Sequence, residues 1–415
     1  MIYGINDRIP LNKLVILSFQ MLWSVFTATV LIARVCGVNV SAALAGAAFA
    51  TIVYTFITKS KSPMFISNSG AFVAPVLFAL GIGGYTGVAI GGATTFIIYC
   101  LFGLIFKSGN VEKIYKIFPK SLIGAVTMVI GISLMGFIGT YVQVNGETNT
   151  WGIVIALLTA IAIAVSSHYC RGFAKMLPLL IGTAFGYAIC MILTLTNVCP
   201  LIDLSVFKGI SIISAPHYAI LQWQKISWAA IMPIILIYTA YTVSAMMECL
   251  SDHWCLGNII GKDLYETPGL SRIFIGEGVA NLVSSVLGGL GACSYGEGVA
   301  CVGFSKAASC DITLMAATML ILLSIFEPVQ AFITSIPNCV FGGAALILYG
   351  YIACSGVKTL QTVDLTNQKN LVIVSAVLSL GISGIAIGGA SFALSGTALG
   401  LVMGVLLNLI LKESE

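Results

Sequence analysis

The chain has 415 residues, of which 59% are hydrophobic and 8% are charged, and its formal net charge is +4. Soluble domains carry roughly 25% charged residues, so this composition excludes an ordinary soluble protein and indicates one embedded in a lipid bilayer. The basic residues are spread along the chain and give no reason to expect nucleic acid as a partner. The 12 cysteines form no CxxC pair and the 3 histidines form no cluster in sequence, so we expect no disulfide framework, no metal site and no cofactor.

Long apolar runs recur at bilayer-spanning length, roughly 17–25 residues each. In chain order we expect spans at 12–34, 41–58, 85–106, 119–139, 150–168, 176–197, 227–249, 271–290, 308–326, 338–355, 368–387 and 393–411. Two further segments, 65–81 and 291–305, are shorter and interrupted by Ser and Gly. Counting both as crossings predicts an all-α polytopic membrane protein with about 14 transmembrane segments (12 + 2 = 14).

The basic residues support this count. If both termini lie on the cytoplasmic side of the plasma membrane, only Arg34, Lys208 and Lys225 of the 19 basic residues fall outside, which leaves 16 inside (19 − 3 = 16). This distribution obeys the positive-inside rule. The inside set includes four lysines in loops or at the end of the chain: Lys107, Lys113, Lys175 and Lys412.

The two halves of the chain share a pattern. Pro119 is followed by Gly124, and Pro337 is followed by Gly342 at the same spacing, each pair opening a predicted span. The broken segments stand third in each half, and the polar stretch 199–226 would join the halves. Seven spans is an odd number, so the halves insert with opposite orientation. Paired broken segments in such an inverted repeat indicate a substrate site near the bilayer midplane.

The broken segments, SNSGAFVAP and ACSYGEGVA, are poor in helix formers. Each is predicted to run as a short strand followed by a half-helix. Two antiparallel strands side by side would satisfy each other's backbone, as the membrane interior requires. The half-helix N-termini would then direct N–H groups toward the centre. The alternative is a pair of kinked helices with incidental glycine.

Three carboxylates fall at membrane depth. Glu248 and Asp252 are four residues apart at the end of a long apolar run, and Glu297 lies in the second broken segment. Intramembrane acids are costly and usually mark a transport pathway or proton relay. Neighbouring carboxylates in a low dielectric resist joint ionisation, so we expect Glu248 and Asp252 to share a proton, with Asp252 as the favoured carrier. The alternative for Asp252 is a helix-end residue that faces cytoplasmic water.

Several motifs together resemble the nucleobase–ascorbate transporter family (nucleobase:cation symporter-2), with the bacterial uracil permeases as its nearest branch. They are FQMLWSVFTATVLIARVCGV, SNSGAFVAP, ECLSDHWCLGNIIGKDLYETPGLSRIFIGEG, SYGEGVACVGFSK and IPNCVFGGAALILYGYIACSG. The resemblance covers most of the chain. It implies a core domain built from 1–110 and 227–326 and a gate domain built from 111–200 and 327–415, and it implies that two copies pair as a homodimer through the gate domain.

The resemblance also implies a substrate-binding set: Glu248, Glu297, Gly70, Gly296, Ala28, Tyr295 and Tyr349. The glutamates would accept hydrogen bonds from the N–H groups of a base, and the glycine backbones would meet its polar edge. The alanine would pack against the ring, and the tyrosines would form apolar walls.

Five positions depart from or bear on the family pattern. Asp252 stands where uracil carriers commonly have His and purine carriers often have Asp, whereas Glu297 stands where xanthine carriers usually have Gln. Gly298, Gly70 and Met21 replace an expected Asn, Phe and His. Loss of bulk at the two glycines would leave room for a larger base.

The sequence therefore predicts a secondary active transporter, not an enzyme, that imports a nucleobase by proton symport with alternating access. Uracil is the favoured base and xanthine or another purine the alternative, and Na⁺ is the disfavoured coupling ion. An anion carrier or channel on the same inverted-repeat fold is a third reading, which the acidic residues oppose. Glu277 is expected to pair with Arg272 or to face another helix, and Glu327 to lie in a loop.

Overall fold

A computed structural model describes residues 3–106, 116, 119–136, 138–144, 147–171, 178–209, 211–385, 387–389, 392–394 and 396–411. The predicted domain boundary near residue 110 lies outside the described residues, as do Lys107, Lys113, Lys175 and Lys412.

The described chain is mainly helical. Its α-helices are α1 (Leu11–Val35), α2 (Val40–Ile57), α3 (Val73–Ile105), α5 (Lys120–Met135), α6 (Ile138–Tyr141), α7 (Thr150–Tyr169), α8 (Pro178–Leu195), α9 (Trp228–Ile260), α10 (Leu270–Gly288), α11 (Gly296–Ser305), α12 (Cys310–Ile325), α13 (Glu327–Ser335), α14 (Asn338–Leu360), α15 (Gln368–Ile382) and α16 (Gly396–Ile410). Short helical turns are η1 (Gly70–Phe72), η4 (Leu204–Phe207), η5 (Ala219–Gln222) and η6 (Tyr265–Gly269).

Seven of the described helices are long and apolar enough to cross a membrane. They are Leu11–Val35, Val40–Ile57, Gly70–Ile105, Thr150–Tyr169, Trp228–Ile260, Tyr265–Gly288 and Asn338–Leu360. Five shorter apolar helices accompany them, within α5, α8, α12, α15 and α16. The longest span contains a break at Gly84, whose φ of 55° and ψ of −151° are not helical. The Gln224 side chain occupies the place that a Cβ at residue 84 would take. This break separates the two predicted segments 65–81 and 85–106.

Three features differ from the sequence prediction. Helix α9 continues to Ile260 rather than ending near 249, so Asp252 lies inside the helix and not at its end. Glu327 begins a helix, α13, with Pro328 in its first turn, and is not in a loop. Helix α15 ends at Ile382 rather than at 387, and the strands β5 (Ile387–Gly389) and β6 (Phe392–Leu394) form a hairpin before α16.

A second hairpin joins β2 (Gln143–Val144) to β3 (Glu147–Thr148).

The two broken segments meet at the centre of the protein. Strand β1 (Ile66–Asn68) pairs antiparallel with β4 (Ala292–Ser294), with Ser67 opposite Cys293, and all six residues are buried. The strands lead directly into η1 and α11, so the N-terminal ends of two short helices approach one region.

Side chains satisfy the outer edges of this two-stranded sheet. On one edge, Thr51 of α2 both donates to the Ile66 carbonyl at 2.6 Å and accepts from the Ile66 N–H at 3.1 Å. On the other edge, the Asn281 amide donates to the Ala292 carbonyl at 2.7 Å, and the Ser294 N–H donates to Glu277 at 3.1 Å. Buried backbone groups need such partners. Glu277 therefore binds the strand edge, and the predicted pairing with Arg272 is replaced by this contact.

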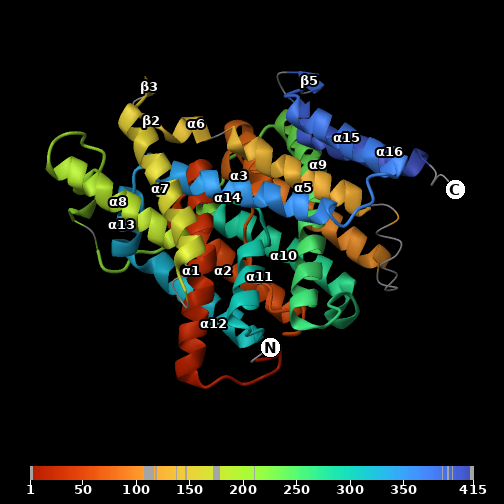
Figure 1. Cartoon of the computed structure of the whole chain (residues 1–415), viewed down its shortest axis with the longest axis horizontal. Helices are drawn as coiled ribbons and strands as arrows, with labels where there is room; N and C mark the ends of the chain where they lie inside the picture. Colours follow the sequence, from red (N-terminus) through yellow and green to blue (C-terminus); the bar gives the residue numbers. More distant parts are fainter. Residues whose placement is uncertain are drawn as a thin grey trace.

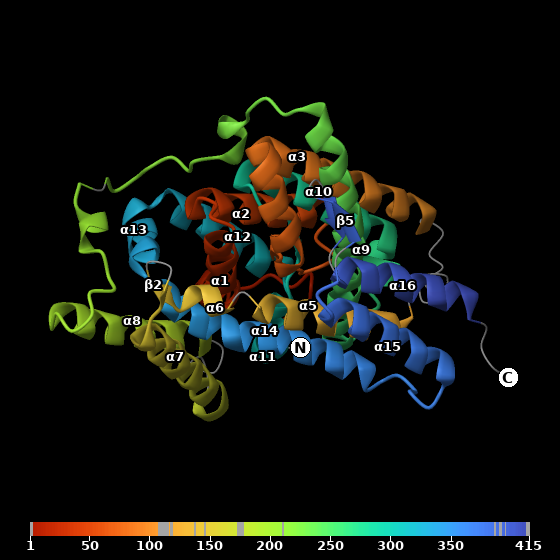
Figure 2. The same cartoon turned by 90° about the horizontal axis from the view of Figure 1, so that it is seen from above.

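The helices form two groups that lie side by side. Figure 2 shows α5, α14, α15 and α16 as a band along one side of a body that contains α1, α2, α3, α10 and α12. Figure 1 shows α1, α2 and α12 next to one another within that body. Glycines allow the closest approaches: a Cβ at Gly46 of α2 would lie 2.8 Å from the Gly288 Cα of α10. The connector between the halves runs beside α12 and α13, where Ser214 N–H donates to the Ile325 carbonyl at 2.9 Å.

Candidate functional site

Glu248 of α9 lies beside the start of η1. The Ser69 hydroxyl donates to Glu248 Oε2 at 3.0 Å, and the Ser69 hydroxyl oxygen accepts from the Ala71 N–H at 3.1 Å. Ser69 is therefore both the cap of η1 and the link that orients the Glu248 carboxylate. Glu248 is half-buried as a residue.

Asp252 lies one helical turn further along α9, toward the start of α11. A Cβ built on Gly296 would lie 3.6 Å from Asp252 Oδ1. Asp252 is half-buried, and its Oδ2 atom has no hydrogen-bond partner in the part of the chain that the structure describes. Gly296 itself is exposed, so the first turn of α11 borders open space beside this carboxylate.

Glu297 completes the group from the first turn of α11. It is half-buried and close enough to Glu248 for their charges to interact. Glu248, Asp252 and Glu297, called here the carboxylate triad, come from α9 and α11 and lie beside the N-terminal end of η1. Helix N-termini carry partial positive charge and free N–H groups. The site thus places hydrogen-bond acceptors and donors together in a half-buried space.

The other predicted site residues lie on η1, α1 and α14 and just before α11. Tyr295 immediately precedes α11, is 6% exposed, and lies near Glu297 and Glu248. Gly70 begins η1 directly after Ser69 and is half-buried. Tyr349 of α14 is buried and approaches Tyr295 from the other helix group. Ala28 is buried in α1. The next residue, Thr29, has its hydroxyl 2.6 Å from the Ser67 hydroxyl of β1.

Comparison with known proteins decides the family. The model of the Permease family (Xan_ur_permease) matches residues 12–388. The chain belongs to this family, the nucleobase–ascorbate transporters. It is a membrane transport protein and not an enzyme.

Curated relatives match this permease over nearly its whole length. The uracil permease of Escherichia coli (strain K12) is 32% identical over 416 residues, which cover 99% of this chain and 94% of the relative. The uracil permease of Paenibacillus larvae is 31% identical over 414 residues, which cover 98% of this chain and 95% of the relative.

Solved structures share its fold at low sequence identity. The transmembrane domain of the cyanobacterial bicarbonate transporter BicA superposes with a TM-score of 0.66 at 15% identity, covering 98% of this chain and 100% of that one. The murine anion transporter Slc26a9 in its inward-facing state gives 0.66 at 13% identity, covering 98% of this chain and 69% of that one. These likenesses concern the fold alone.

Two departures from the family pattern lie in contact in this permease. A Cβ added to Gly298 would lie 3.2 Å from the Phe65 Cβ and 3.7 Å from the Met21 sulfur. Met21 is 2% exposed, so its side chain is packed into the space beside Gly298. A side chain at 298 would therefore press against Phe65, and the expectation that its absence leaves room for a larger base stays a prediction.

A polar cluster next to the triad was missed by sequence reasoning. Ligand atoms of Cys249, His253 and Glu277 lie within 4.8 Å of one another, all buried. The spacing of Cys249 and His253, four residues apart on one helix, is the signal that was available. His253 Nδ1 lies 2.7 Å from the Cys249 carbonyl, which can only accept, and Nε2 lies 2.6 Å from the Tyr54 hydroxyl. Both ring nitrogens are thus engaged, so the ring has no free lone pair for a metal.

Proposed function

We propose that this permease imports a nucleobase, with uracil favoured, by proton symport in an alternating-access cycle. The observation that supports this most is the approach of Glu248 and Glu297 to each other beside two helix N-termini. The curated relatives named as uracil permeases support the choice of base.

The chemistry of the site suits a planar, neutral base. A pyrimidine or oxopurine alternates N–H donors with C=O acceptors along its edge. The carboxylates of Glu248 and Glu297 supply charge-assisted acceptors. The first N–H groups of η1 and α11 have no intrahelical acceptor and would meet the carbonyls of the base at Gly70 and Gly296. A site in which every polar group forms a hydrogen bond with the base rejects ligands that lack one of the matching groups, because a buried polar group of the site would then have no partner.

The remaining lining is apolar. In this proposal Ala28 packs against the ring, and Tyr295 and Tyr349 form walls on opposite sides of the seam between the two helix groups. Tyr349 comes from α14 and Tyr295 from the start of α11. Closure of that seam would therefore bury the base between residues from both groups.

The two candidate bases differ in size. Asp252 favours xanthine or another purine, since purine carriers often have Asp at this position. The packing of Met21 beside Gly298 favours the smaller uracil, because it removes space that a bicyclic base would use. We favour uracil and keep xanthine as the second candidate.

An anion carrier or channel is the third candidate function, because the chain shares its fold with the bicarbonate transporter BicA and the anion transporter Slc26a9. Three half-buried carboxylates in one site make its potential negative, which opposes anion binding. The carboxylate triad therefore separates this permease from the anion carriers in chemistry.

The proposed architecture is two inverted repeats of seven spans, 14 in all. Three pairs of elements from equivalent positions of the halves lie in contact: α2 with α10, β1 with β4, and α5 with α14. Such pairing of equivalents is expected around a two-fold pseudo-axis in the membrane plane. In this proposal the body around α1, α2, α3, α9, α10, α11 and α12 is the core domain, and α5 to α8 with α13 to α16 form the gate.

Asp252 is the proposed proton carrier, and Glu248 shares its proton. Asp252 lies one turn from Glu248 and has an oxygen without a partner among the described residues. Two carboxylates this close in a low dielectric resist joint ionisation, so one proton held between them would move with the base. Na⁺ coupling is disfavoured. Cytoplasmic termini, a plasma-membrane location and a homodimer formed through the gate belong to the same proposal.

The test is uptake of radiolabelled uracil and xanthine by proteoliposomes. We expect an inward proton gradient to drive uracil uptake, an uncoupler to abolish it, and a Na⁺ gradient to have no effect. Glu248→Gln and Glu297→Gln should each abolish uptake, whereas Glu266→Gln, at an exposed glutamate, serves as the matched control. Uptake of neither base, or full uptake by both site variants, would overturn the proposal.

A further inference from the structure

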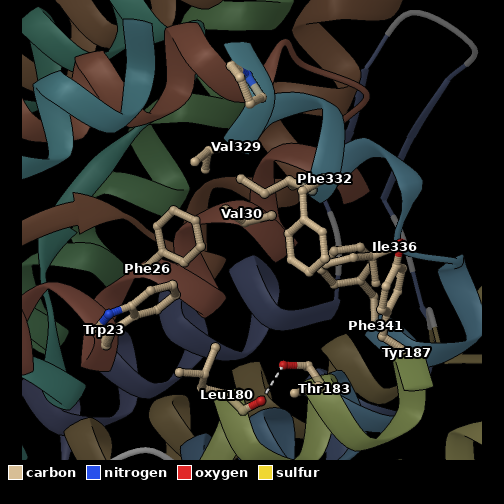
Figure 3. Close-up of a pocket in the computed structure, with 13 residues that line it drawn as sticks. Trp23, Phe26, Val30, Leu180, Thr183, Tyr187, Val329, Phe332, Ile336 and Phe341 are labelled. Carbon is tan, nitrogen blue, oxygen red and sulfur yellow. Dashed lines mark hydrogen bonds between the residues drawn. The ribbon is translucent and has the colours of Figure 1, made fainter. Parts of the chain in front are cut away.

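An apolar cavity lies between α1 and the helices α8, α13 and α14. Its volume is about 280 Å³. Figure 3 shows Trp23 and Phe26 of α1 on one side of it and Phe332, Phe341 and Tyr187 on the other. This cavity is separate from the carboxylate triad, and none of the triad residues lines it.

The cavity opens on a surface that the bilayer would cover. Phe332 at its edge is 45% exposed, and Ala184 of α8, another lining residue, is exposed. The neighbouring Phe185 on α8 is 48% exposed. Apolar cavities of this kind stay dry and accept apolar ligands. In a membrane protein the apolar molecules at such an opening are lipid acyl chains.

A cation lies at one end of the cavity. Trp23, Phe26 and Val30 line it from α1, and Arg34 follows at the next position of the same face, four residues beyond Val30. The Arg34 guanidinium carbon lies 5.8 Å from the centroid of the Phe341 ring, which also lines the cavity.

Among the residues that the structure describes, no acidic side chain forms an ion pair with the Arg34 guanidinium. Arg34 Nη2 donates at 3.2 Å to the side-chain amide oxygen Oδ1 of Asn338, a neutral partner. A guanidinium has five N–H donors and binds phosphate oxygens in a fork. Arg34 is half-buried, so its side chain is partly accessible from outside the protein.

The distance along α1 from Trp23 to Arg34 matches the hydrocarbon thickness of one bilayer leaflet. Trp23 and Arg34 are 11 residues apart (34 − 23 = 11) on one helix, which corresponds to about 16 Å at 1.5 Å per residue. One leaflet contributes about half of the ~30 Å hydrocarbon core. An acyl chain beginning near Arg34 would therefore end near Trp23.

We propose that this cavity binds one acyl chain of an anionic phospholipid whose phosphate is held by Arg34. The lipid would come from the leaflet on the side where α1 ends. It would contact α1 of one helix group and α8, α13 and α14 of the other, and so would hold the two groups together in the conformation described here. The proposal does not depend on which base is transported.

The test uses Trp23 as a fluorescent probe inside the cavity. The chain has 5 tryptophans, so replacement of Trp151, Trp223, Trp228 and Trp254 by Phe leaves only Trp23. The protein is placed in vesicles that contain either phosphatidylglycerol or phosphatidylcholine, each brominated near the end of the acyl chain. We expect about a fivefold preference for the anionic lipid in quenching titrations, the contribution of one basic residue near a membrane surface.

Two variants test the lipid site, and a third variant serves as the control. Arg34→Gln should remove the preference for phosphatidylglycerol, and Ala184→Leu should lower quenching by both lipids because it fills the cavity. Lys225→Gln, at an exposed cation in the connector, should leave the preference unchanged. Native mass spectrometry of the unmodified protein checks the result without the tryptophan replacements, and should show retained phosphatidylglycerol that Arg34→Gln loses.

Equal quenching by the two lipids would overturn the assignment of the phosphate to Arg34. Absence of quenching, or quenching that Ala184→Leu does not change, would overturn the occupation of the cavity. Loss of the preference in Lys225→Gln as well would show a general surface-charge effect and would also overturn the proposal.

Discussion

Ser69 offers the sharpest test of how the candidate site is organised. Its hydroxyl donates to Glu248 and accepts from the Ala71 N–H, so Ser69→Ala removes both contacts. A hydrogen bond to a charged group contributes roughly 1.5–3 kcal/mol. Since 1.4 kcal/mol is a factor of ten, we expect base affinity to fall about 10- to 150-fold if this bond orients Glu248 for binding. The lost cap should also lower stability by about 1 kcal/mol.

Ser67→Ala is the matched control, because it removes a neighbouring buried hydroxyl that does not touch the carboxylates. Ser67 lies 2.6 Å from the Thr29 hydroxyl, which keeps its bond to the Val25 carbonyl when Ser67 is changed. Thermal unfolding should show destabilisation in both variants, whereas equilibrium binding of uracil should weaken only in Ser69→Ala. If both variants bind uracil like the unmodified protein, Glu248 is not oriented by Ser69 and the reasoning fails.

Three further changes test coupling, packing and the seam between the helix groups. Asp252→Asn should abolish accumulation driven by a proton gradient but retain exchange of internal for external base; retained accumulation would contradict the proposed proton carrier. Gly298→Asn should lower the unfolding free energy by about 1–3 kcal/mol through overpacking. Adding Met21→Ala should reduce that loss, because the smaller side chain leaves space beside residue 298. If the effects of the two substitutions on the unfolding free energy are strictly additive, the two positions are not coupled. Trp254→Leu removes the ring beneath Lys120, a contact worth roughly 0.5–1 kcal/mol, and should speed hydrogen exchange at the start of α5; unchanged exchange would refute a role for this contact.

The carboxylates could be found from the sequence because acids are rare in apolar runs. Glu248 and Glu297 stand out by composition alone, and the structure brings them within electrostatic range although they come from different helices. Local Ser and Gly content likewise marked the two segments that carry β1 and β4. These features depend on residues that are close together in the sequence, and sequence patterns predict such local features best.

Contacts between distant residues could not be read in the same way. Met21 and Gly298 are 277 positions apart (298 − 21 = 277), and only the packed structure shows that the Met21 side chain lies beside Gly298. The extension of α9 past 249 was missed because Asp252 and His253 make its last turns polar. Those turns are stabilised by tertiary contacts, since His253 is 1% exposed and bonded to Tyr54. Of the two alternatives for Glu277, pairing with Arg272 is replaced by a bond from the Ser294 N–H. Its position beside Cys249 and His253 of α9 agrees with the other alternative, a side chain that faces another helix.

The proposed repeat would also account for where the two helix groups touch. Lys120 opens α5 and Asn338 opens α14, and their separation of 218 residues (338 − 120 = 218) equals that of Pro119 and Pro337 (337 − 119 = 218). Lys120 Nζ lies 5.4 Å from the centroid of the Trp254 ring on α9. Equivalent helix starts in the two halves thus contact the other helix group.

Both contacts are present in the same conformation. The start of α14 meets Arg34 of α1 by a hydrogen bond and an arginine–aromatic contact, while the start of α5 meets α9 through Lys120. If the halves are inverted, these contacts lie toward opposite faces of the membrane. In the proposed alternating-access cycle, each contact would then separate while the other holds. Cation–aromatic contacts of roughly 0.5–2 kcal/mol are weak enough to open within a transport cycle and strong enough to bias it. A lipid bound at Arg34 would strengthen one contact alone, and so would favour the state in which that face is closed.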